Sequence, residues 1–138
     1  MITANRVFRR CVDLARQHGL GRIEVANLPM VPCTTLLLNE HERAAEAEIA
    51  IEAAARAGAH RAEIVARQVA GQILLDMAEL QRARLCMETA LAAARRLGAR
   101  RFEAESLMFL GAIEHAAGRR PEARRLAVEH LPSTARPE

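Results

Sequence analysis

Histidines, together with a few adjacent carboxylates, are the first candidates for catalytic or metal-binding residues. The five histidines are scattered along the chain, at His18, His41, His60, His115 and His130. The pair His41-Glu42 begins like a zinc-protease motif, but no second histidine follows at the spacing that a helix would need to hold zinc. No set of histidines and cysteines has the spacing of a metal site, and no metal is predicted.

Nucleophilic side chains are equally isolated. Cys11, Cys33 and Cys86 are far apart and form no C-x-x-C pair, and Ser106 and Ser133 lie outside any Gly-x-Ser-x-Gly elbow. Cys11 and Cys86 fall on apolar helix faces, where a cysteine is expected to behave as a core residue. An odd number of cysteines without a secretion signal favours reduced thiols and a cytoplasmic chain.

Neither a pair of catalytic carboxylates nor a phosphate-binding loop is predicted. Glu103 and Glu105 stand two positions apart, so a helix points them to different faces. All 20 basic residues are arginines, which excludes a phosphate-binding loop that ends in Gly-Lys. The sequence therefore predicts no catalytic residue and no cofactor, and we expect a protein that is not an enzyme.

A short pattern recurs three times, over residues 19–24, 58–63 and 98–103. Each copy reads Gly, two residues, Arg, one residue, Glu, and the glycines Gly19, Gly58 and Gly98 lie 39 and 40 positions apart. Such glycines close a helix in the left-handed conformation. The glutamates Glu24, Glu63 and Glu103 then fall in the first turn of the next helix, where the helix dipole favours a carboxylate. We expect Arg22, Arg61 and Arg101 to pair with neighbouring acids.

A second break divides each period into two helices. Turns are predicted at residues 118–120, 76–79 and 39–41, with Pro121 suited to a first helical turn. Gly71 and Gly111 are 40 positions apart, as are Ala83 and Ala123. Each period therefore reads as helix, short turn, helix and longer loop.

Apolar residues between the breaks recur at helical spacing. The predicted stripes are Val65, Val69, Ile73 and Met77; Ala83, Met87, Ala90, Leu91, Ala94 and Leu97; and, in the first helix, Val7, Cys11 and Leu14. Pro29 and Pro32 interrupt the helix expected over 22–39, so it should kink there or begin near Pro29, with residues 36–38 packing inward.

Composition supports an all-α fold, with 51% hydrophobic residues but only 2% aromatic ones. We predict one domain over 1–131, with a capping or truncated-repeat helix at 1–20, helix pairs at 22–60, 61–100 and 101–131, and a disordered tail at 132–138. Because the chain begins with the second helix of a repeat, that helix is expected to be a cap or the remnant of a longer array.

The residues Leu110-Gly111, Gly118 and Ala123, together with Gly71, Ala83 and Ala90, resemble the tetratricopeptide signature. The resemblance covers residues 22–130, although the period is near 40 rather than the usual 34 or so. It implies a right-handed α-solenoid of antiparallel helix pairs, about seven helices in all. The Ala- and Arg-rich period of about 40 is similar to the helical arrays of large bacterial signalling proteins, both nucleotide-cyclase proteins with an ATPase module and multidomain transcription activators.

In tetratricopeptide arrays the first helix of each pair lines a groove that binds a protein segment. The resemblance places Gln68, Gln72 and Leu75 in that groove, with Met108, Ala112 and His115 one repeat further on. In some family members, lysines and asparagines of the groove bind the terminal carboxylate of a peptide. The six positions named here carry neither residue, which argues against a ligand of that type. The expected function is a noncatalytic interaction scaffold that docks a protein segment or a sister domain of a larger regulator.

Two other functions remain open at this point, besides a small-molecule sensor pocket inside the superhelix. The apolar ends of a short array favour self-association, for example as a homodimer. Nucleic-acid binding would use the arginines of the C-terminal half, which are Arg95, Arg96, Arg100, Arg101, Arg119, Arg120, Arg124 and Arg125. Interleaved acids and scarce aromatics argue against nucleic acid, and no apolar run is long enough for a membrane span.

Overall fold

The computed structural model describes residues 4–34 and 39–130, and this part of the chain is all-α, with no strand. The helices are α1 (Ala4–Gln17), α2 (Gly21–Asn27), α3 (Met30–Thr34), α4 (Glu40–Arg56), α5 (His60–Asp76), α6 (Leu80–Leu97), α7 (Arg100–Ala116) and α8 (Arg120–His130). The prediction of about seven helices is met by the seven segments of seven residues or more, with α3 as an extra five-residue segment.

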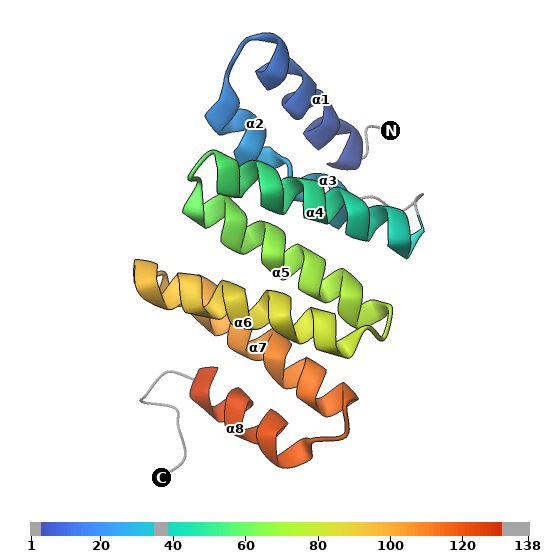
Figure 1. Cartoon of the computed structure of the whole chain (residues 1–138), viewed down its shortest axis with the longest axis vertical. Helices are drawn as coiled ribbons and strands as arrows, with labels where there is room; N and C mark the ends of the chain where they lie inside the picture. Colours follow the sequence, from blue (N-terminus) through green and yellow to red (C-terminus); the bar gives the residue numbers. More distant parts are fainter. Residues whose placement is uncertain (1–3, 35–38, 131–138) are drawn as a thin grey trace.

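Successive helices pack on one another from α1 at one end of the molecule to α8 at the other (Figure 1). The contacts run from α4 through α5, α6 and α7 to α8, and α5 also contacts α7. The largest apolar cluster joins α5, α6, α7 and α8 through residues such as Leu74, Met87 and Ile113. Small alanines of α4, α6 and the α6–α7 corner are fully or nearly fully buried, which allows the helices to approach closely.

Within residues 4–34 and 39–130, five corners share one turn geometry, and four of them are closed by a glycine in the left-handed conformation. Gly19, Gly58, Gly98 and Gly118 have φ between 62° and 79°, and Ala78 takes the fifth position with φ 59°. At Gly98 the amide donates to the carbonyl of Arg95 (3.1 Å), and the amide of Ala99 donates to that of Ala94 (2.9 Å). The same pair of hydrogen bonds recurs at all five corners. The prediction that Gly19, Gly58 and Gly98 close helices at equivalent corners is confirmed.

Carboxylates mark the helix starts, as expected for the positive end of a helix dipole. Glu24, Glu63 and Glu103 lie in the first turns of α2, α5 and α7. Glu24 pairs with Arg16 (2.8 Å) and Glu103 with Arg95 (3.1 Å), and both arginines come from the preceding helix. Glu63 pairs with Arg67, and of the repeated arginines Arg101 pairs with Glu105 (3.0 Å).

The proline-containing segment is broken, as predicted, into α2 and α3 on either side of Pro29. Residues 36–38 and the tail at 132–138 lie outside the described part of the chain. The following helix begins at a capping box, in which the Asn39 side chain accepts from the Glu42 amide (3.0 Å) and the Glu42 carboxylate accepts from the Asn39 amide (3.3 Å).

Two predicted apolar stripes require correction. In α1 the buried residues are Val12 and Ala15, whereas Val7 and Leu14 are exposed. The helix is therefore rotated so that a neighbouring stripe meets α2 and α3. In α6, Leu97 is exposed because it occupies the last residue before the Gly98 corner, beyond the cover of the adjacent helices.

Candidate interaction surfaces

Helices α5 and α7 share an exposed face built from equivalent positions of the repeat. Gln72, Met108, Ala112 and His115 are exposed and Leu75 is half-buried. Gln72 and Ala112 stand 40 positions apart, as do Leu75 and His115, and the two helices are in contact. Five of the six residues predicted for a groove are therefore accessible on neighbouring helices.

Gln68 is the exception, and its assignment to an accessible groove is wrong. The side chain is only 7% exposed, and its amide nitrogen donates to the Ser106 hydroxyl (2.9 Å) and to the carbonyl of Phe102 (3.1 Å). Ser106 is completely buried. Gln68 thus ties α5 to α7 beneath the exposed face, because a buried amide must satisfy its hydrogen-bonding groups inside the protein.

The repeat-junction residues lie where consecutive helices cross. A Cβ on Gly71 of α5 would come within 2.7 Å of Met87 Cε and 3.3 Å of the Ala83 carbonyl oxygen of α6. A Cβ on Gly111 of α7 would have an ordinary contact, 3.6 Å, with the Ala123 carbonyl oxygen of α8. Equivalent glycines therefore face equivalent alanines at both crossings, with the tighter approach at α5 and α6.

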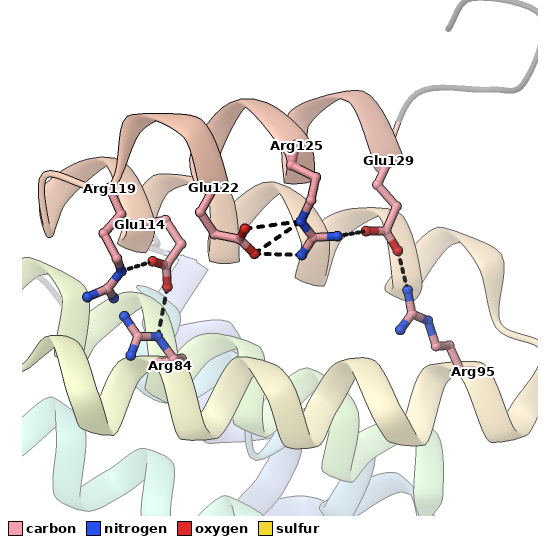
Figure 2. A network of polar contacts seen from close by, with 7 residues as sticks. All are labelled: Arg84, Arg95, Glu114, Arg119, Glu122, Arg125 and Glu129. Carbon is pink, nitrogen blue, oxygen red and sulfur yellow. Dashed lines mark hydrogen bonds and ion pairs between the residues drawn. The ribbon is translucent and has the colours of Figure 1, made fainter.

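A polar network connects α6, α7 and α8 on another side of the molecule (Figure 2). The Glu114 carboxylate, at the end of α7, is buried and accepts from Arg84 of α6 (2.7 Å) and from Arg119 in the corner before α8. Arg84 also donates to Gln81 (3.2 Å). The two guanidinium groups compensate the negative charge of this buried carboxylate, so the contact has a structural role.

The second half of the network is exposed. Arg125 of α8 bridges Glu122 (2.6 Å) and Glu129 (3.1 Å), and Glu129 also pairs with Arg95 of α6 (2.5 Å). The hydrogen bond that Arg125 donates lowers the pKa of Glu122, and those that Arg95 donates to Glu103 and Glu129 raise the pKa of Arg95. These charges link α8 to α6 on the same side as Arg84 and Glu114.

Several arginines that were considered for nucleic-acid binding take part in ion pairs. Arg95, Arg101, Arg119 and Arg125 each pair with at least one glutamate in the structure. Half of the eight arginines therefore already have an intramolecular partner.

The residues first considered for chemistry remain apart. Among residues 4–34 and 39–130, no three histidine, cysteine or acidic side chains are grouped so as to hold a metal ion. Cys33 is exposed, whereas Cys11 and Cys86 are half-buried, and burial raises the pKa of the Cys86 thiol. Within those residues no helix is both long enough and apolar enough to cross a bilayer.

The sequence did not predict the polar contacts between residues that are far apart in the chain. Gln68 and Ser106 are 38 positions apart, and Arg84 and Glu114 are 30 apart. The available signal was a lone polar residue inside an apolar stripe, as at Gln68 and Ser106. That signal indicates a buried hydrogen bond but does not name the partner.

No protein-family model matches this sequence, and no curated protein matches it either.

Proposed function

We propose that this protein is a noncatalytic interaction scaffold, a right-handed α-solenoid of tetratricopeptide-like antiparallel helix pairs. Its partner is a protein segment or a sister domain of a larger bacterial signalling or transcription-regulating protein. The scaffold binds with the exposed face of α5 and α7.

The observation that carries this proposal is the repetition of accessible positions on two helices in contact. Gln72 and Ala112, and Leu75 and His115, hold the same places in their helices. The face mixes an amide, an imidazole and apolar side chains, including the exposed thioether of Met108. Methionine side chains adapt to varied apolar partners, and such mixed faces suit the binding of peptide segments.

The recurring corners support the solenoid. Repeated helix pairs bury their apolar stripes against their neighbours, so that equivalent faces line up along the stack. The identical hydrogen bonds at Gly58, Gly98 and Gly118 give successive helices the same turn geometry.

Affinity capture with the full chain tests the proposal. Ala112→Arg places a long cation on the face of α7, and Ala92→Arg places the same cation on an exposed position of α6 as the matched control. We expect the wild type and Ala92→Arg to capture the same proteins from an extract of the source cells, and Ala112→Arg to lose them by about tenfold or more. Equal capture by both variants, or no captured protein at all, would contradict the proposal.

A further inference from the structure

Helix α1 has two apolar faces, and the described residues cover one of them. Val12 and Ala15 are buried on the face that contacts α2 and α3. Val7, Cys11 and Leu14 form the other stripe, at spacings of four and three residues, with Val7 52% and Leu14 38% exposed. This spacing is the seam along which a second helix packs.

The stripe points away from α4. Arg9 pairs with Glu46 of α4 (2.8 Å), which identifies the side of α1 that faces α4. With a helical step of about 100° per residue, Val7, Cys11 and Leu14 lie about 140–160° around α1 from Arg9. A helix bound to the stripe would therefore continue the row of helices beyond α1.

The other end of the row does not offer such a surface. Glu129 turns toward Arg95 of α6, and the residues about 140–180° around α8 from Glu129 are Arg120, Arg124 and Ala127. All three are exposed, and two of them are charged. An apolar stripe is thus a property of the α1 edge.

Net charge alternates in sign among α1, α4 and α6, whereas α2, α3 and α5 between them carry no net charge. Helix α1 has four arginines and one aspartate, a net charge of +3; α4 has five glutamates and two arginines, −3; α6 has four arginines and one glutamate, +3. Ion pairs cross both gaps, from Arg9 to Glu46 and from Arg82 to Glu48 (3.0 Å). Each basic helix of this series is therefore bridged to an acidic one.

We propose that the stripe of Val7, Cys11 and Leu14 docks an acidic amphipathic helix of a partner protein. Apolar residues of that helix fill the stripe, and its carboxylates face Arg10, which lies about 40–60° around α1 from Leu14 and Val7. The inference extends the proposed scaffold function to a second surface, and it does not use the face of α5 and α7.

A second copy of this chain fits the stripe less well. Two α1 helices packed about a twofold axis would bring together two helices that each keep a net charge of +1, since Glu46 and Glu24 neutralise Arg9 and Arg16 and leave 3 − 2 = 1. The acidic helix of another copy, α4, already has Glu46 and Glu48 paired with Arg9 and Arg82. Charge complementarity therefore selects a separate acidic helix.

Fluorescence anisotropy with a designed peptide tests the proposal on the full chain. The probe is a labelled helix of about three heptads with Leu at the seam and Glu on both flanks, and the matched control peptide has Lys in place of every Glu. We expect the Glu peptide to bind with a Kd of about 10 μM and the Lys peptide to bind at least about tenfold more weakly.

Variants of the chain locate the site. Leu14→Gln and Arg10→Glu should each weaken binding of the Glu peptide by about fivefold or more. The matched controls Leu85→Gln and Arg100→Glu change exposed residues of α6 and α7 and should leave binding unchanged. Circular dichroism checks that each variant is folded.

Four outcomes would overturn the proposal. The first three are no binding of the Glu peptide, equal binding of both peptides, and affinity unaffected by Leu14→Gln and Arg10→Glu. The fourth is a dimer seen by light scattering and lost in Leu14→Gln, which would assign the stripe to a second copy. None of these results alters the capture experiment with Ala112→Arg, so failure at α1 and failure of the scaffold function are distinguishable.

Discussion

Oε1 of Glu114 lies 2.7 Å from Nε of Arg84, and this ion pair joins α7 to α6 with the carboxylate side chain only 7% exposed. Arg119 approaches the other carboxylate oxygen from the corner before α8. One buried charge therefore holds two cations, one from α6 and one from the corner that leads to α8 (Figure 2). The stability of the α6–α8 region should depend on it.

Glu114→Ala should lower the free energy of unfolding by about 2–4 kcal/mol, because it leaves the half-buried Arg84 guanidinium without its carboxylate. Urea denaturation followed by circular dichroism measures the change. Glu105→Ala is the matched control, since Glu105 pairs with Arg101, which is 86% exposed, and should lower it by no more than about 0.5 kcal/mol. Equal losses in the two variants would show that burial adds nothing to the Glu114 contacts.

Gly71→Ala and Gly111→Ala should change stability in opposite directions. The added methyl group at Gly71 would lie 2.7 Å from Cε of Met87, a fully buried side chain, so overpacking should lower the free energy of unfolding by about 1–2 kcal/mol. At Gly111 the nearest atom would be 3.6 Å away, and the higher helix propensity of alanine should stabilise by up to about 1 kcal/mol.

Thermal unfolding of the two glycine variants tests the difference in helix approach. A Tm lowered in Gly71→Ala and raised in Gly111→Ala is the expected result. A rise in both would mean that Met87 moves aside without cost, and that the crossing of α5 and α6 is looser than the structure has it.

The corners could be predicted from sequence because their determinants are local. A left-handed residue and the first turn of the next helix lie within six positions of each other, so Gly58 and Glu63 specify one corner without help from distant residues. The break at Pro29 is local in the same sense, since the ring itself interrupts the helix.

The choice of buried face in α1 could not be predicted in the same way. Val7, Cys11 and Leu14 form one apolar stripe, and Val12 and Ala15 belong to its neighbour. Helical periodicity identifies both stripes but does not say which one α2 and α3 cover. That depends on tertiary contacts, as does the burial of Gln68 against Ser106 from another helix.

Ala78→Gly should stabilise the protein, because Ala78 takes a corner position that glycine takes at residue 118. Left-handed φ costs an alanine about 1–2 kcal/mol. Replacement by glycine removes this cost, but the greater conformational freedom of glycine in the unfolded chain offsets about 0.4–1 kcal/mol of the stability gained. We expect the free energy of unfolding to rise by about 0.5–1 kcal/mol in urea denaturation.

Gly98→Ala is the converse of this change and should destabilise, since it forces a side chain into φ 63° at an otherwise identical corner. Loss of stability in Ala78→Gly would indicate that the methyl group of Ala78 makes a contact worth more than the backbone strain.

Cys86 should be the slower of two thiols to react, because burial raises its pKa whereas Cys33 is exposed. Alkylation by iodoacetamide requires the thiolate and access to it, so mass spectrometry should find Cys33 modified about tenfold or more faster than Cys86 in the folded chain. In urea the two rates should converge. Equal rates in the folded protein would contradict the placement of Cys86 between the apolar clusters of α4, α5 and α6.

The raised pKa also sets the sign of a pH effect on stability. The folded state holds the Cys86 proton more tightly than the unfolded state does, so this contribution to stability is fully present below the ordinary pKa of a thiol. It is lost as the pH rises through the higher pKa of the folded state. Urea denaturation at about pH 7 and about pH 10 should therefore show a smaller alkaline loss of stability in Cys86→Ala than in the wild type. An equal loss in the two proteins would mean that the thiol has the same pKa in the folded and unfolded chains.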